Sequence, residues 1–100
     1  MDLEECLKRI KLCLKNKDFV YSRHFKERMR ERRFEEKEFE EIIKNNELLS
    51  FEKQNKNLYK LLYYLNEEKD LVLIVNTNVR VKLVTVYKIN NSKRIRNNEK

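Results

Sequence analysis

Three side chains at four-residue spacing carry the clearest chemical signal in this sequence. His24 is the one histidine, and Arg28 and Arg32 follow it at successive four-residue steps. A helix aligns all three along one stripe, with Phe25 and Met29 on a neighbouring stripe that can pack against a core. The helix would present an imidazole beside two guanidinium groups. That is a phosphate-handling surface, although a solvated basic helix can show the same pattern by accident.

These residue types suit RNA cleavage without a metal ion. The reaction needs a base for the 2′-hydroxyl proton, an acid for the leaving 5′-oxygen and cations for the phosphate. Histidine titrates near neutrality, so His24 is the candidate acid or base. Arg28 and Arg32 can hold phosphate oxygens bidentately. Tyr87 is a candidate second proton carrier or base-stacking group, and Thr85 a candidate donor to phosphate.

Each candidate also has a structural interpretation. His24 would then bond to a carbonyl or carboxylate, Arg28 and Arg32 would pair with nearby glutamates, and Thr85 and Tyr87 would pack as ordinary strand residues. The candidate nucleic-acid contacts are five further basic residues: Arg30, Arg33, Lys60, Arg80 and Lys82. For those on strands, the alternative is a solvated strand face.

Charge and length limit the class of protein. One hundred residues make a single domain with one core. The net charge of +7 favours a polyanionic partner, most often nucleic acid, and an acidic antitoxin-like protein fits equally well. Residues 21–33 carry six basic and two acidic side chains, a local +4, whereas residues 34–49 carry two and six, a local −4. Helices of opposite sign can pair with each other, which weakens the argument from charge.

Several functional classes are excluded or disfavoured by composition. No apolar run approaches the ~20 residues that span a bilayer, and the acidic N-terminus lacks a signal-peptide layout, so we predict a soluble cytoplasmic protein with no membrane partner. Cys6 and Cys13, on one expected helix, would have Cα atoms roughly 10 Å apart, too far for a disulfide. They lack partners at metal-ligand spacing, and no metal or cofactor is expected.

Glycine and proline are both absent from the sequence. Their absence excludes the Gly-rich phosphate loops of nucleotide-binding proteins. Turns are expected to use asparagine, the next best residue for a left-handed backbone.

The order of elements predicts an α+β domain. Apolar spacing indicates a helix over 2–15, and 22–46 is interpreted as two helices that break near Arg33, the first capped by Ser22. Four strands are expected over 48–53, 58–65, 71–75 and 79–89. Two or three N-terminal helices would therefore pack on a four-stranded antiparallel sheet. The single domain 1–100 would comprise a helical part (about 2–46), a sheet part (about 48–89) and a basic tail (90–100).

Strict alternation along the last strand places Val81, Leu83, Thr85 and Tyr87 on one face. The two polar groups would then lie at the edge of an apolar surface, beside the His24 helix. Three other aromatic residues, Tyr59, Tyr63 and Tyr64, are expected in the core, with base stacking as the alternative.

Two segments together resemble a group of small prokaryotic proteins, domain-of-unknown-function family 4258. The first comprises His24, Arg28, Glu31-Arg32 and an acidic helix from Phe34 to Asn45, and the second is the strand Val84-Thr85-Val86-Tyr87. The resemblance covers roughly residues 21–89. The chain departs from the family pattern at Arg33, where the family usually has glycine, and in lacking Gly and Pro turn residues before the sheet.

That family is similar to the RelE, barnase, EndoU and colicin-type ribonuclease toxins, which set helices against a curved antiparallel sheet. The resemblance implies a metal-independent endoribonuclease, often partnered by an antitoxin. The leading hypothesis is therefore a toxin-like endoribonuclease that acts on RNA through His24 with Arg28 and Arg32. The alternatives are a non-catalytic module of the same fold that binds nucleic acid or a protein, and a mobile-element regulatory protein that uses its charged helices as an interface.

Geometry discriminates between these hypotheses. In an enzyme, His24, an arginine and either Thr85 or Tyr87 should converge on one accessible concavity. In a binding module, His24 would be buried, or its arginines would be paired with glutamates.

Overall fold

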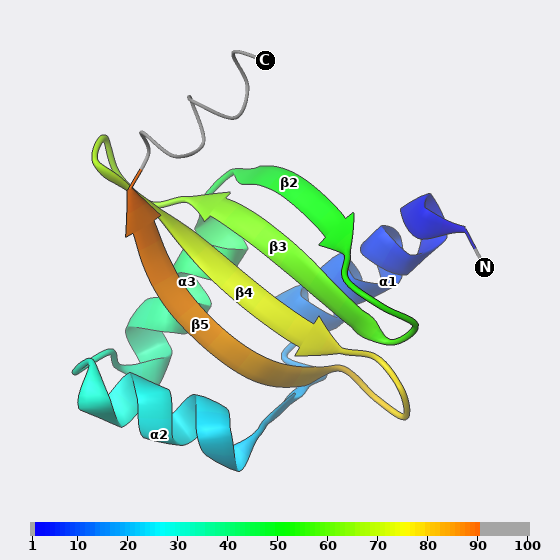
Figure 1. The fold of residues 1–100 in the computed structure, drawn as a ribbon, viewed down its shortest axis with the longest axis horizontal. Coiled ribbons are helices and arrows are strands. Elements are labelled where there is room, and N and C mark those ends of the chain that lie inside the picture. The colour runs from blue at the N-terminus through cyan, green and yellow to red at the C-terminus, as the bar shows by residue number, and fades with distance from the viewer. Residues whose placement is uncertain (1, 91–100) are drawn as a thin grey trace.

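The computed structural model describes residues 2–90 and has three helices and five strands in this range. In chain order they are α1 (Leu3–Lys15), β1 (Val20–Tyr21), α2 (Arg23–Glu31), α3 (Glu36–Asn45), β2 (Leu48–Lys53), β3 (Leu58–Tyr64), β4 (Lys69–Asn76) and β5 (Lys82–Asn90) (Figure 1). The α+β class is confirmed. Asn90, expected in the basic tail, ends β5, and the rest of that tail lies outside the described residues.

The sheet is mixed and has the strand order β1-β5-β4-β3-β2. Strands β2 to β5 form the expected antiparallel meander, but β1 adds a fifth strand that runs parallel to β5, through Val20 opposite Lys82 and Tyr21 opposite Leu83. The prediction of four antiparallel strands was therefore wrong at this edge. A two-residue strand is too short to produce a periodic pattern, and backbone hydrogen bonds to β5 define it.

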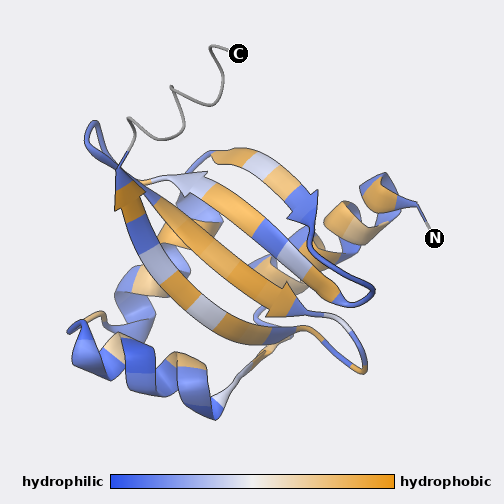
Figure 2. Cartoon of the chain, in the orientation of Figure 1, coloured by the Kyte–Doolittle hydropathy of each residue, from blue (hydrophilic) through white to orange (hydrophobic). Residues whose placement is uncertain are grey.

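The helices cover one face of the sheet (Figure 1). Leu71, Leu73 and Val75 of β4 are completely buried on that face, in one cluster with Phe25 of α2 and Phe39 of α3. Figure 2 shows β4 as a largely hydrophobic strand and α2 as a largely hydrophilic helix. Burial of each such side chain is worth about 1.5–3 kcal/mol, so Phe25 and Met29 anchor a very polar helix on the sheet.

The break between α2 and α3 occurs at Arg33, as predicted. Arg33 has φ 53°, and two backbone bonds close the end of α2: Phe34 N–H donates to the Met29 carbonyl at 2.8 Å and Arg33 N–H to the Arg30 carbonyl at 3.2 Å. Phe34 and Met29 are both buried, which completes a Schellman ending. The end of α2 is therefore fixed by the left-handed backbone of Arg33 and by the burial of Met29 and Phe34.

Asparagine does not supply the left-handed residues that the sequence led us to expect. Within residues 2–90, positive φ occurs at Lys17 (58°) and Arg33 (53°). The asparagines act through their side chains instead: Asn55, Asn66 and Asn76 accept backbone N–H bonds within the loops that follow β2, β3 and β4. These local bonds replace the turn-forming role of glycine.

A bulge in β5 decides which side chains reach the outer face of the sheet. Val75 lies opposite Leu83 and Ile74 lies opposite Thr85, so Val84 is an extra residue with no partner in β4. Leu83 remains buried against the helices, but after the bulge Thr85 follows the side-chain direction of Ile74, away from them. Strict alternation was therefore wrong here.

Candidate functional site

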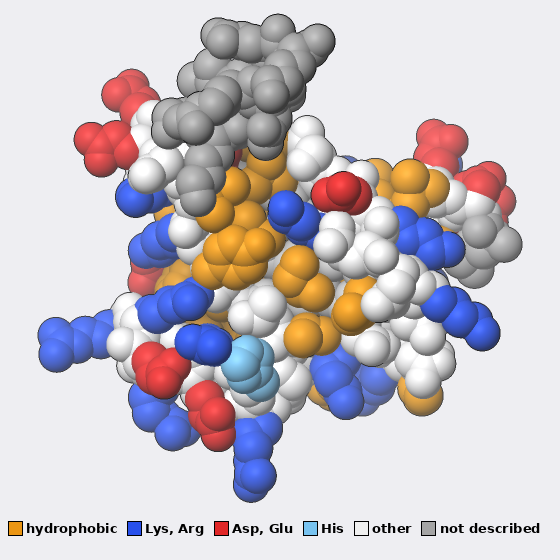
Figure 3. Space-filling view, viewed as in Figure 1, with side chains coloured by type: hydrophobic (Ala, Val, Ile, Leu, Met, Phe, Trp, Pro, Cys, Tyr) orange, Lys and Arg blue, Asp and Glu red, His pale blue; other side chains and the backbone are white. Residues whose placement is uncertain are grey.

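The face of the sheet turned away from the helices is the first component of the candidate site. Two cross-strand rows run over it, one of Glu52, Lys60, Ile74 and Thr85 and one of Ser50, Leu62, Val72 and Tyr87. We call this side of the sheet, which carries Lys60, Leu62, Val72, Ile74, Thr85 and Tyr87, the open face; Leu62 and Val72 are buried within it and the other four side chains are half-buried. Figure 3 views this side of the molecule, with hydrophobic side chains near its centre and basic side chains and the single histidine around them.

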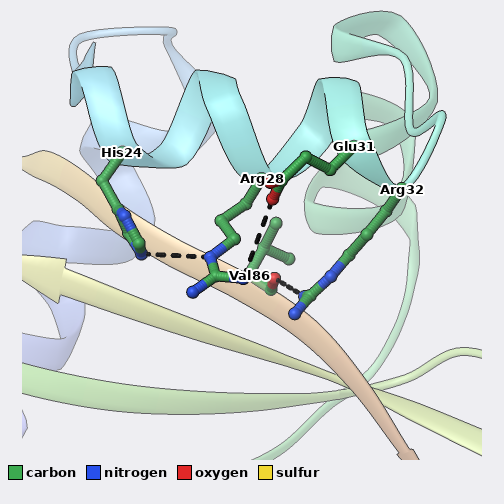
Figure 4. A network of polar contacts seen from close by, with 5 residues as sticks. All are labelled: His24, Arg28, Glu31, Arg32 and Val86. Carbon is green, nitrogen blue, oxygen red and sulfur yellow. Dashed lines mark hydrogen bonds and ion pairs between the residues drawn. The ribbon is translucent and has the colours of Figure 1, made fainter.

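The second component is the stripe formed by His24, Arg28 and Arg32, which we call the α2 stripe. Ser22 fixes where the helix begins: its Oγ accepts a bond from Phe25 N–H at 3.0 Å, as the predicted cap should. All three side chains of the stripe project from α2 toward β5 (Figure 4). The spacing argument therefore predicted their alignment correctly.

His24 is exposed and contacts Arg28. The Arg28 Nε–H donates to Nε2 of His24 at 3.3 Å, so this ring nitrogen acts as the acceptor of the bond. Arg28 also lies 3.7 Å from a Glu31 carboxylate oxygen. Both side chains of that ion pair are well exposed, so it contributes little stability and leaves Arg28 easily recruited by an anion.

Arg32, just beyond the last residue of α2, closes the outer edge of β5. Its guanidinium donates to the Val86 carbonyl, and the Ser22 hydroxyl donates to the Val84 carbonyl at 3.2 Å. Strand β1 covers only the start of β5, so these two bonds satisfy backbone groups that would otherwise lack a strand partner. The glutamate pairing expected as the alternative for Arg32 is not found among residues 2–90.

A hollow of about 520 Å³ lies beside Arg32 and is also lined by Phe34, Tyr87 and Lys88. The Lys88 ammonium lies 5.0 Å from the centre of the Phe34 ring. The hollow brings together one predicted arginine and one predicted tyrosine. Phe34 and Lys88 were missed as site residues, because their proximity arises from the helix ending at Arg33 and from the bulge in β5.

The predicted residues do not all converge on one point. Eight residues separate His24 from Arg32, which corresponds to about 12 Å along a helix. His24 with Arg28 thus forms one group, and Arg32 with Tyr87 forms a second group further along β5. The geometry therefore agrees in part with each hypothesis. His24 is accessible, as expected for an enzyme, but one of its arginines is paired with a glutamate, as expected for a binding module.

The predicted nucleic-acid contacts do not gather on one surface. Lys60 and Thr85 share a row of the open face, and Lys82 lies opposite Asn76 at the start of β5. The other three lie elsewhere. Arg30 is about 200° around α2 from Arg28, Arg33 forms the turn after α2, and Arg80 pairs with Asp18 at 3.2 Å.

The three tyrosines of β3 differ in burial. Tyr59 and Tyr63 are buried in the core, as expected, and burial raises the pKa of Tyr63 to about 12. Tyr64 is 38% exposed, so its placement in the core was wrong. It lies opposite Asp70, which in turn lies opposite Ile89, in the last row of the sheet on the outer side.

A tyrosine that is hydrogen-bonded to an ion-paired glutamate packs against α2. The Tyr21 hydroxyl donates to Glu40 at 2.7 Å, and Lys17 lies 3.0 Å from the other oxygen of that carboxylate. The bond from Tyr21 lowers the pKa of Glu40, while burial and the same bond raise the pKa of Tyr21. The Tyr21 ring lies 5.3 Å from Phe25, so this network fixes α1, β1 and α3 against the helix that carries the stripe.

The fold and the site together define an α+β protein with a basic helix along the edge of a mixed sheet. A model of the MJ0788 family matches residues 5–75, and the chain belongs to this family. The matched range contains the α2 stripe and Lys60 and ends before β5. No curated protein and no solved structure matches the chain. Within residues 2–90, every helix is too short or too polar to cross a bilayer.

Proposed function

We propose that this protein is a toxin-like, metal-independent endoribonuclease whose RNA lies across the open face beside the α2 stripe. One observation carries the proposal: an exposed imidazole in contact with an exposed guanidinium borders a sheet face that presents a threonine and a tyrosine. Together these groups supply a proton acceptor, a phosphate-binding cation, a hydroxyl donor and a ring for base stacking.

In this mechanism the neutral His24 takes the proton of the RNA 2′-hydroxyl through Nε2. The 2′-oxygen attacks the adjacent phosphorus, and the 5′-oxygen leaves with a proton supplied by Tyr87 or by water. The products are a 2′,3′-cyclic phosphate and a 5′-hydroxyl. Arg28 turns its Nε–H from His24 to the phosphate, and the charge that develops on the phosphate oxygens strengthens that bond. Arg32 and Lys60 hold neighbouring phosphates.

The partners in this proposal are RNA in the cytoplasm and a protein antitoxin. The antitoxin follows only from the resemblance to ribonuclease toxins. RNA is supported by chemistry, because an arginine beside the half-buried ring of Tyr87 suits a strand with phosphates on one side and bases on the other.

A second candidate function is RNA binding without cleavage. The bond from Arg32 to the Val86 carbonyl favours it, since a guanidinium that closes a strand edge has fewer donors left for a phosphate. The spread of about 12 Å between His24 and Arg32 also favours it, because reacting groups must lie within hydrogen-bond reach of one phosphate.

The two candidates are separated by cleavage of a labelled RNA in excess EDTA. Wild-type protein should cut and leave 2′,3′-cyclic phosphate ends, and His24→Ala and Arg28→Ala should not. Arg30→Ala is the matched control: it removes the same charge from the far side of α2 and should cut as well as wild type.

Binding of the same RNA, measured by fluorescence anisotropy at two salt concentrations, completes the test. If the wild-type protein and all three variants bind the RNA and none of them cuts it, the binding module is favoured. Equal cutting by all four proteins would indicate a contaminant and contradict the roles of His24 and Arg28.

A further inference from the structure

A second basic surface lies in the helix layer, between α1 and the connection from α3 to β2. It surrounds a hollow of about 710 Å³. Four lysines line the hollow: Lys8, Lys11 and Lys15 from α1 and Lys44 from the end of α3. We call this surface the lysine groove. Figure 1 shows α1 and α3 on the side of the sheet opposite the open face.

The lysines of this groove are available to a ligand. All four are exposed, and none of them lies within ion-pairing distance of a carboxylate of residues 2–90. Among the described residues that line the hollow, Glu47 is the one acidic side chain. The groove therefore concentrates positive charge where three of its lysines follow one another along a single side of α1.

Beneath the lysines the groove is aliphatic. Leu14 is buried, Ile43 and Leu48 are half-buried, and Leu12 is 60% exposed at its border. Asn46 keeps the groove open: it ends α3 with an extended backbone, and its side-chain amide donates to the Tyr64 carbonyl at 2.8 Å. The chain thus turns directly into β2 without filling the space beside α1.

We propose that the lysine groove binds an acidic amphipathic segment of a protein partner. Apolar side chains of the segment would occupy the aliphatic floor, and its carboxylates would reach the lysines on either side. Lysine suits this ligand because an ammonium group is a point charge that a flexible carboxylate can approach from many directions. The inference does not depend on RNA cleavage, since the groove shares no residue with the open face or the α2 stripe.

RNA fits this groove less well than an acidic protein segment. The groove lacks arginine forks, and the one aromatic residue among its described lining, Tyr63, is 3% exposed and offers no ring for stacking. A second copy of the chain fits less well too. Its longest acidic segment is α3, whose apolar residues Phe39 and Ile42 are already buried in the core, and the acidic first turn of α1 offers a single exposed leucine, Leu3.

The test uses a fluorescein-labelled synthetic peptide of about 14 residues, close to the shortest length that forms a helix in water. Its leucines repeat at helical spacing and its other positions are mostly glutamate. Fluorescence anisotropy with the full chain should show binding that weakens at least about tenfold in Lys11→Glu/Lys44→Glu. The matched control Lys53→Glu/Lys56→Glu makes the same charge change at exposed positions near the β2–β3 turn and should bind within about twofold of wild type.

Three further measurements can overturn the proposal. A peptide of the same composition whose leucines do not follow helical spacing should bind weakly. If it binds as tightly as the amphipathic peptide, the groove is a general polyanion site and the proposal is wrong. A single-stranded RNA oligonucleotide whose binding falls in Lys11→Glu/Lys44→Glu, while peptide binding does not, would identify RNA as the occupant. A wild-type dimer in sedimentation velocity that this variant converts to a monomer would identify a second copy. Circular dichroism of all variants checks that the fold is retained.

Discussion

The open face with its α2 stripe and the lysine groove are both basic, but they are built from different side chains. The first combines two arginines and a histidine with the ring of Tyr87, on the outer side of the sheet and along its β5 edge. The second sets lysines over leucine and isoleucine within the helix layer. The basic residues behind the net charge of +7 are therefore not gathered on a single surface. The choice of cation and the side chains beneath it distinguish the kind of anion each surface suits.

The largest effect is expected for His24→Ala. Loss of a general acid or base typically costs about 10²–10⁴-fold in rate, so RNA cleavage should fall by at least about a hundredfold. Binding of the acidic peptide in the lysine groove should not change. The measurement is the rate of RNA cleavage in EDTA beside peptide anisotropy on the same samples. A parallel loss of both would mean that the two surfaces are not independent.

Arg32→Ala should affect stability as well as RNA. It removes the donor to the Val86 carbonyl at a partly buried strand edge, and a hydrogen bond from a charged group is worth about 1.5–3 kcal/mol. We expect the free energy of unfolding in urea to fall by about 2 kcal/mol. Arg28→Ala is the control, because its bonds are to exposed side chains and its loss should cost under about 0.5 kcal/mol. Equal losses would contradict an edge-closing role for Arg32.

Tyr21→Phe should lower stability in a pH-dependent way and leave both surfaces chemically intact. The bond from Tyr21 lowers the pKa of Glu40 below its ordinary value of 4.5 in the folded state. The stability that this bond supplies is therefore present above pH 4.5 and is lost as the pH falls through the lower, folded value. We expect a loss of about 1 kcal/mol at pH 7 that shrinks under acidic conditions. Thermal unfolding at pH 7 and near pH 3 would show the difference, and a loss of equal size at both would exclude Glu40 as its source.

The smallest effect is expected for Arg33→Gly. Arg33 has φ 53°, a conformation that costs an L-residue roughly 1–2 kcal/mol and glycine almost nothing, although glycine also gains entropy in the unfolded chain. The net result should be a stabilisation of up to about 1 kcal/mol in urea. Because Arg33 belongs to neither surface, RNA and peptide binding should stay within about twofold despite the lost charge. A large fall in RNA affinity would return Arg33 to the nucleic-acid contacts.

The sequence predicted most elements of the fold. The apolar stripes gave the three helices, and the Ser22 cap and the break near Arg33 were both confirmed. The strand β1 was missed because its two residues are held by pairing with β5, which is distant in sequence. The mixed character of the sheet depends on that contact, so no local pattern could have predicted it.

The candidate site was predicted less completely than the fold. The alignment of His24, Arg28 and Arg32 depends on helical spacing alone and was correct. The outward direction of Thr85 depends on Val84, which has no partner in β4. Val84 is one of several β-branched apolar residues in this strand, so the sequence does not indicate that it forms a bulge. The lysine groove was missed for a related reason: its lysines lie on two helices far apart in sequence, and each helix alone has an ordinary solvated face.

The two bonds from Ser22 and Arg32 to β5 also have a consequence for self-association. They occupy two carbonyls of β5 beyond the short strand β1 at one border of the sheet, whereas β2 forms the other border and has no second neighbouring strand among residues 2–90. Because β1 has only two residues, β2 offers a foreign strand the longer edge for pairing. Two copies that met there would pair their β2 edges, and the edge left on each copy would be the two-residue β1, which is a poor template for further pairing. The bonds from Ser22 and Arg32 thus also reduce the length of β5 edge that is available for strand pairing between copies.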